Sequence, residues 1–326
     1  MAGTLANIAA VSSGRRLRAA FQAIAVLALL VAGQGIGVAQ DEAQSRVSVW
    51  HISSCHLGSP RRYEPDLEIR KYDNGWERSS LEEFQAGSSP DQITCIFVHA
   101  ARALDDATFS RSFELYHSMA RRSDAPVRLV IWSWPTPRSL CVVRDFRISY
   151  GVLDYHAYYL GWFLSQLPEN ERVSLIGFSM GAGVICGAAH VVAGGSLAGC
   201  SLPESRGPSQ LHVVLWSAAF DNHWLMSGHH YGRAMSRIGE LFMLVNRLDP
   251  VLKRYHLVQA CGRASAAGYT GIAGLARMGE YRSLITQMDG SRWLGRHHDF
   301  DRHIHSSRIL GYSLETLLWE SSNENL

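Results

Sequence analysis

The sequence lacks a strong excess of charge of either sign. The 326-residue chain has 31 Lys and Arg residues against 29 Asp and Glu residues, a formal net charge of +2, and only 18% of its residues are charged. Without residues 1–39, which hold three arginines and no acid, the balance becomes 28 basic against 29 acidic residues, or −1. A chain without a basic excess does not have the electrostatic footprint of a nucleic-acid-binding protein, so we expect no nucleic-acid partner.

Acidic residues are absent before Asp41, and this segment has the layout of a secretory signal. Three arginines between positions 15 and 18 precede an apolar stretch from Ala19 to Ala32, and Ala39 suits a cleavage site. The sequence therefore predicts a signal peptide over 1–39, a single domain over 40–326, and a periplasmic, envelope or secreted location. An uncleaved N-terminal membrane anchor is the alternative, because the apolar region extends to about 20 residues if its polar and glycine positions are tolerated.

Motifs for metal or redox chemistry are also missing. None of the six cysteines forms a Cys-x-x-Cys pair, and the chain has no His-Glu-x-x-His motif. The histidine-rich run from 297 to 305 lacks the spacing of a zinc site, so we expect a surface loop there, with no metal and no cofactor. Cysteines of an exported chain are able to pair, but Cys95 lies in a strand-like run and Cys186 in a helix-like run, which favours buried free thiols.

Strand-like apolar runs alternate with segments of helical spacing after the leader, and 47% of the chain is hydrophobic. This alternation predicts an α/β fold, with a mostly parallel central sheet and helices on both faces. The strand candidates are residues 47–52, 93–99, 127–132, 173–177, 212–216, 241–245 and 284–288. The helix candidates are residues 106–120, 153–167, 182–192, 229–238 and 308–319.

Polar or Gly/Pro-rich stretches separate these runs. We expect loops at 64–91, 135–137 and 194–208, and a surface excursion at 262–279 that is rich in Gly and Ala and able to fold over the site. The connections leave little room for a large cap domain, and the sequence shows no internal repeat. One domain is therefore the simplest organisation.

One serine is the first candidate for chemistry, because it lies in the run Gly177-Phe178-Ser179-Met180-Gly181. An apolar strand candidate precedes this run and a helix candidate follows it, which is the context that a Gly-x-Ser-x-Gly nucleophile needs. The two glycines allow neighbouring backbone to come close to a strained turn, while the serine is pushed out at the carboxyl end of the sheet. A serine nucleophile also needs a base, an acid to orient that base, and donors for an oxyanion.

On these residues the chain resembles the α/β-hydrolase superfamily, from about residue 92 to the end. Within it, Ile-Trp-Ser-Trp-Pro at 131–135, Asp-Pro-Val-Leu at 249–252 and the histidine cluster near 298 are similar to uncharacterised bacterial serine-hydrolase-like proteins. The resemblance implies the α/β-hydrolase fold and catalytic partners in the chain order serine, acid, histidine. It names no substrate.

The superfamily order implies that the acid follows the strand candidate 241–245. Asp249 lies there, directly before Pro250, and is the expected acid. Asp221, which follows the preceding strand candidate, is the alternative. Asp249 is also open to interpretation as a residue that only caps the helix after it.

The base is expected in the last loop before the final helix. In similar proteins the base precedes an aromatic residue by two positions and a serine by eight. His298 has that spacing to Phe300 and Ser306, which makes it the expected base. His297 is the near alternative, and His303 is expected to begin the helix or to face solvent.

The backbone N–H groups of Met180 and Ala101 are the expected oxyanion donors, because one residue follows the nucleophile and the other follows the strand candidate 93–99. Related proteins usually have His-Gly where this chain has His99 and Ala100. If that position needs a backbone angle that glycine alone adopts freely, Ala100 is strained and activity is reduced. His99 is expected to be a buried structural histidine.

The leading hypothesis is a serine hydrolase of the carboxylesterase or lipase kind that acts on a small-molecule ester or acyl substrate. Ser179 would attack the carbonyl carbon, His298 would move the proton, and Asp249 would orient the histidine. The alternative is a non-catalytic binding or scaffolding protein that keeps the hydrolase fold, which the departure at Ala100 favours. A membrane is expected as a partner only if the leader is not cleaved.

Overall fold

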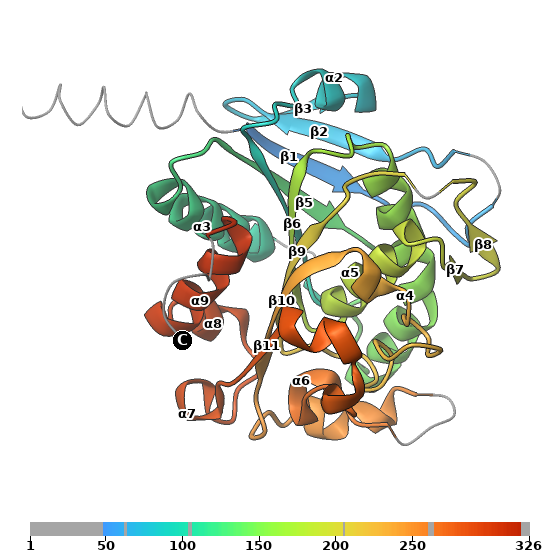
Figure 1. The fold of residues 1–326 in the computed structure, drawn as a ribbon, viewed down its shortest axis with the longest axis vertical. Helices are drawn as coiled ribbons and strands as arrows, with labels where there is room; N and C mark the ends of the chain where they lie inside the picture. The colour runs from blue at the N-terminus through green and yellow to red at the C-terminus, as the bar shows by residue number, and fades with distance from the viewer. Residues whose placement is uncertain (1–47, 62–63, 104–105, 205, 260–263, 321–326) are drawn as a thin grey trace, which may run out of the picture. The chain divides into compact units, whose positions relative to one another are not determined.

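A nine-stranded sheet forms the centre of the fold (Figure 1). The computed structural model describes residues 48–61, 64–103, 106–204, 206–259 and 264–320, so the leader lies outside the described residues. The strand order is β11-β10-β9-β6-β4-β5-β1-β2-β3. Every neighbouring pair from β11 to β1 is parallel, whereas β2 is antiparallel to both β1 and β3. The expectation of a mostly parallel sheet is confirmed.

The parallel strands coincide closely with the strand candidates of the sequence. Their bounds are β1 Ser48–Ser53, β4 Ile93–Val98, β5 Val127–Ser133, β6 Arg172–Phe178, β9 Leu211–Trp216, β10 Ile238–Val245 and β11 Ile285–Asp289. All residues of β4 and of β5 are buried, because helices cover both faces of this part of the sheet. Burial on both faces explains why these strands appear in the sequence as continuous apolar runs.

Helices lie on the two faces of the sheet (Figure 1). On one face α4 (Val142–Ser165) packs against α5 (Met180–Val192). On the other face lie α3 (Asp106–Arg122), α8 (Phe300–Ile304) and α9 (Ser307–Leu317). Within the described residues, no helix combines the length and the apolar content needed to cross a bilayer.

Shorter elements fill the connections. They are β2 Glu68–Tyr72, β3 Trp76–Ser79, α2 Leu81–Ala86, β7 Ser196–Leu197, β8 Cys200–Ser201, η1 Ala234–Ser236, η2 Leu252–Leu257, α6 Ala267–Thr270, η3 Leu275–Arg277, η4 Gly279–Leu284 and α7 Ser291–Leu294. The expectation of a plain loop at 64–91 is therefore wrong, since β2, β3 and α2 occupy most of it. These strands are short, lie at the sheet edge and carry charged side chains, so they lack an apolar run.

Two further expectations need correction. Residues 229–238 do not form a helix: they form turns, with the short helix η1 and the first residue of β10. Several N–H groups here bond the carbonyl three residues earlier, as in Gly232 to His229 and Ala234 to Tyr231, so the segment forms successive turns in place of a continuous helix. The segment 262–279 is not a surface excursion throughout. Near the start of its described part, Ala266 and Ala267 are fully buried.

All five cysteines in the described part of the chain are free thiols, and Cys261 lies outside it. Cys95 and Cys186 are fully buried, as expected. Burial raises the pKa of both thiols, which keeps them protonated. These two cysteines act as small apolar core residues.

Candidate active site

Ser179 lies in the sharp turn between β6 and α5. Its backbone has φ 57° and ψ −120°, a strained conformation for a residue with a side chain, and it is 2% exposed. The neighbouring strand holds this conformation: the Ser179 N–H donates to the Trp216 carbonyl at 2.9 Å, and the Ser179 carbonyl accepts from the Ala219 N–H at 3.0 Å. The end of β9 therefore fixes the turn that presents the serine.

Two glycines allow this turn to form. A Cβ at position 177 would lie 2.7 Å from the backbone nitrogen of Ala182. A Cβ at position 181 would overlap the Val98 carbonyl oxygen and lie 2.6 Å from that of His99. Gly177 and Gly181 are therefore required by close backbone approach, and Gly181 lets α5 begin directly against the end of β4.

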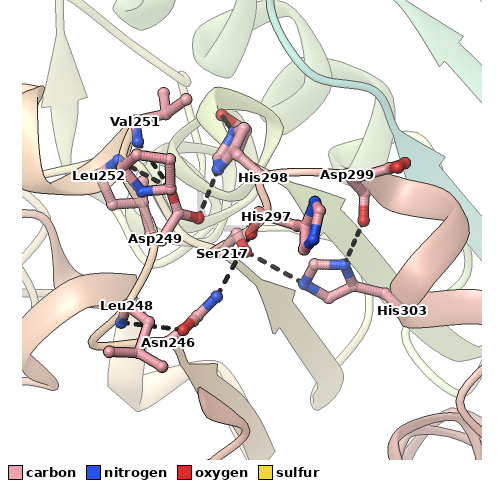
Figure 2. Close-up of polar contacts among 12 residues, drawn as sticks. Ser217, Asn246, Leu248, Asp249, Val251, Leu252, His297, His298, Asp299 and His303 are labelled. Atoms are coloured by element: carbon pink, nitrogen blue, oxygen red, sulfur yellow. Dashed lines mark hydrogen bonds and ion pairs between the residues drawn. The ribbon is translucent and has the colours of Figure 1, made fainter. Parts of the chain in front are cut away.

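His298 lies between Ser179 and Asp249. Its Nε2 is 2.9 Å from Ser179 Oγ, and its Nδ1 is 2.7 Å from Asp249 Oδ2, the second contact being drawn in Figure 2. A carboxylate only accepts, so the ring carries its proton on Nδ1, and Nε2 is left to accept from the serine hydroxyl. The structure thus brings the three residues proposed from the sequence into one hydrogen-bonded chain.

The Asp249 carboxylate is fully buried and its two oxygens have different partners. Oδ2 faces His298, whereas Oδ1 accepts from the N–H groups of Val251 at 2.8 Å and Leu252 at 3.0 Å, at the start of η2. The capping interpretation and the orienting interpretation therefore both hold for this residue. Backbone donors on one oxygen fix the direction in which the other meets the imidazole.

The alternatives to the acid and the base have other contacts. Asp221 Oδ1 accepts from the Tyr255 hydroxyl at 2.8 Å and from Gln259 Nε2 at 2.6 Å. The His297 backbone carbonyl accepts from Asn246, while it is the neighbouring His298 that reaches the serine. The geometry therefore favours Asp249 and His298 over Asp221 and His297.

Asn246 links the two loops of the site, although no sequence motif marks it as a functional residue. Its side chain is buried at the end of β10. Nδ2 donates to the carbonyls of Gly295 at 3.0 Å and His297 at 3.3 Å, while Oδ1 accepts from the Leu248 N–H at 3.0 Å (Figure 2). One amide thus links the loop that carries the histidine to the loop that carries the acid. The nearest sequence signal is its position directly after a strand.

His303 is a second residue that the sequence did not identify. The expectation that it begins the last helix or faces solvent is wrong, because it is fully buried near the end of α8. Its Nδ1–H donates to the Asp299 carbonyl at 2.7 Å, and its Nε2 accepts from Ser217 Oγ at 3.0 Å (Figure 2). Burial lowers the pKa of His303 to about 4, so the ring is neutral. The two hydrogen bonds of His303 hold the backbone that follows His298 in place.

The loop after β4 forms the other side of the site. The strain expected at Ala100 is absent, since the positive φ in this loop, 64°, belongs to Arg102. His99 is buried, as expected, and its carbonyl accepts from the indole N–H of Trp134 at 2.9 Å. Ala101 is also buried and lines a cavity with Ser179. Replacement of glycine by alanine therefore costs no unusual backbone angle here.

Two cavities meet at Ser179. One, of about 220 Å³, is lined almost entirely by apolar side chains from the start of α4 and from η2, together with Met180. The other, of about 180 Å³, lies between the loop after β4 and His298. Phe146 lines both. A substrate with two arms is therefore able to place its reacting carbon at the serine with one arm in each cavity.

Within the described residues, no three His, Cys, Asp or Glu side chains are arranged to hold a metal ion. The histidines of the 297–305 run have separate partners: His298 belongs to the serine site, His303 is buried in α8, and His305 is exposed beside Glu114. Comparison of the chain with models of known families finds no match, and comparison with curated proteins finds no relative. We therefore infer function from the geometry of Ser179, His298 and Asp249.

Proposed function

We propose that the chain is a serine hydrolase with the α/β-hydrolase fold, and that it cleaves carboxylic esters through an acyl-serine intermediate. The observation that carries this proposal is the hydrogen-bonded chain from Ser179 through His298 to Asp249. The order of these groups supports it: the serine follows β6, the acid follows β10, and the histidine follows β11. The leader favours an exported enzyme that acts on envelope or exogenous esters.

The reaction follows from the donors and acceptors of these side chains. Ser179 Oγ attacks the carbonyl carbon while His298 Nε2 takes the hydroxyl proton, and the carbonyl oxygen becomes an oxyanion. When the oxyanion collapses, the C–O bond to the alcohol breaks and the alcohol takes the proton from His298. Water then attacks the acyl carbon and gives a proton to His298, which returns it to Ser179 as the acid leaves. Asp249 stabilises the imidazolium in both steps.

The backbone N–H groups of Met180 and Ala101 are the proposed oxyanion donors. Met180 begins α5, so its N–H is one of the free donors at a helix N-terminus. Ala100 does not favour a non-catalytic protein, because that residue has no positive φ and carries no backbone strain. Ester hydrolysis is therefore favoured over a scaffolding role.

A fluorophosphonate probe tests the proposal. The wild-type protein is expected to become labelled at Ser179, and Ser179→Ala to remain unlabelled. His298→Ala is expected to slow hydrolysis of a soluble nitrophenyl ester by about 1,000-fold or more, because the serine loses its base. Ser110→Ala, which changes an exposed serine on α3, is the matched control and should label normally. Absence of labelling in the folded wild-type protein, or labelling that persists in Ser179→Ala, would contradict the proposal.

A further inference from the structure

Four exposed apolar side chains belong to, or directly precede, the segments that line the 220 Å³ cavity. Leu140 is fully exposed, Val142 and Val143 are 48% and 39% exposed, and Leu257 is 41% exposed. The last three line the cavity together with Ser179, and Leu140 stands two residues before Val142. We name these four residues the apolar rim. They come from the start of α4 and from η2, which Arg147 links by donating from Nε to the Leu257 carbonyl at 3.0 Å.

Four cations lie on the same two elements as the apolar rim. Arg144 and Arg147 are exposed on the first turns of α4, and Lys253 and Arg254 are exposed on η2. In the described part of the chain, none of these four cations forms an ion pair with a carboxylate. Asp145 is the acid nearest in sequence, but it is buried and bonded to Arg102 and Ser139. The two segments at the cavity therefore carry both exposed apolar side chains and exposed cations, and Arg254 itself lines the cavity.

This combination limits what covers the surface. Exposed leucine and valine side chains that are contiguous with a functional cavity mark an interaction site. A second copy of the chain meeting this surface about a two-fold axis would bring the cations of both copies together, which is unfavourable. An anionic lipid surface satisfies both features, because acyl chains take up the apolar side chains and headgroups pair with the cations.

We propose that the apolar rim and its four cations dock on an anionic lipid bilayer, and that the enzyme draws acyl esters from the membrane into the apolar cavity. This inference rests on the proposed function. Val142, Val143 and Leu257 belong both to the rim and to the cavity wall, so an acyl chain reaches Ser179 along a continuous apolar path. A soluble ester has to enter the same path from water.

Cys141 offers a direct readout of docking, because its thiol is exposed between Leu140 and Val142. A polarity-sensitive fluorophore is attached there in the Ser179→Ala background, so that no lipid is hydrolysed during the measurement. The same labelling reaction on the Cys141→Ser variant measures any signal from fluorophore attached to other cysteines. On addition of vesicles of equal parts phosphatidylcholine and phosphatidylglycerol, the emission is expected to shift to the blue. Phosphatidylcholine vesicles alone should give a much weaker response.

Paired variants separate the apolar and the electrostatic contributions. Arg144→Gln combined with Lys253→Gln is expected to raise the lipid concentration for half-maximal response roughly fivefold per cation removed, and added salt should act in the same direction. Leu257→Ser is expected to weaken docking on the order of tenfold. Tyr312→Ser, on α9, removes a side chain that is 44% exposed and is the matched control.

Several outcomes would overturn the docking proposal. One is an emission that does not shift with either vesicle type, and another is a lipid response that is unchanged when both cations are removed. A third is a blue shift on concentrating the protein without lipid, which would indicate that a second copy covers the surface. The measurement does not use Ser179. A protein that docks but resists fluorophosphonate therefore refutes the proposed hydrolase activity alone, and a labelled protein that does not dock refutes the membrane surface alone.

Discussion

Asn246 connects the loops that carry His298 and Asp249. Asn246→Asp keeps the size of the side chain and the acceptor for the Leu248 N–H, but it removes both donors and sets a carboxylate against two carbonyl oxygens. We expect it to lower kcat for a soluble ester by about tenfold or more, with a smaller change in KM, because the base loses its alignment while the cavities remain. Steady-state kinetics measure this difference.

Asn222→Asp is the matched control for that variant. Asn222 donates from Nδ2 to Thr270 Oγ1 at 3.0 Å and makes no contact with the three site residues. Thermal unfolding of both variants shows how much stability each loses. If the two variants lose the same fraction of kcat, the assigned role of Asn246 in positioning the histidine is wrong.

The residues of the hydrogen-bonded chain are predictable from sequence, whereas their supports are not. Ser179 lies in a recognisable motif, and Asp249 and His298 follow strand candidates in the order that the superfamily implies. Asn246 and His303 are single buried polar residues. Their partners, Gly295 for Asn246 and Ser217 for His303, lie far away along the chain. A contact of that kind depends on which carbonyl or hydroxyl the fold brings within reach, and it leaves no local pattern.

At the scale of elements, Gly181 determines how closely α5 approaches β4. We expect Gly181→Ala to lower the free energy of unfolding by about 3 kcal/mol, because its Cβ would meet two carbonyl oxygens of the β4 end that cannot move separately. Activity should fall as well, since the displaced loop carries Ala101. Chemical denaturation and ester kinetics test both effects.

Gly151→Ala provides the opposite case on a neighbouring element. Gly151 lies inside α4, it is exposed, and a Cβ there would meet nothing within 4 Å. We expect this variant to raise the free energy of unfolding by about 1 kcal/mol, the usual gain in helix propensity. If Gly181→Ala instead raised the free energy of unfolding, the close contact between α5 and the end of β4 would be contradicted.

The elements that the sequence predicts well are those that are buried on both sides. Strands β4, β5 and β6 appear as apolar runs because helices cover both faces of the sheet. The helix α4 begins at Val142, well before the expected start at Leu153, because its first turns are exposed and mix arginines with valines. These exposed turns lack the regular spacing of apolar residues that marks a helix. In this protein, two of their exposed residues, Val142 and Val143, belong to the apolar rim.

Buried and half-buried histidines make the stability of the whole molecule sensitive to acid. Burial lowers the pKa of His51 to about 4, that of His156 to about 3 and that of His303 to about 4. Below their ordinary pKa of about 6.5 the unfolded chain takes up protons at these rings while the folded chain does not, so stability is lost as pH falls from about 6.5 to about 4. Above that range both states are neutral and these groups have no effect.

Each of these histidines is expected to cost on the order of 2–3 kcal/mol across that interval. Calorimetric unfolding between about pH 7 and pH 5 should therefore show a falling midpoint. His156→Gln should flatten the slope, because it removes one of these differences in proton binding between the folded and the unfolded chain. A midpoint that stays constant over this range would contradict the buried, neutral state of these rings.

The first turn of η2 has two roles in this molecule. Val251 and Leu252 hold the carboxylate of Asp249 with their N–H groups and line the apolar cavity with their side chains. If the proposed acyl chain occupies this cavity, it contacts the same turn that sets the direction of the Asp249 carboxylate. On the proposed function, acyl chains of different length are then expected to change the rate of the chemical step as well as the affinity.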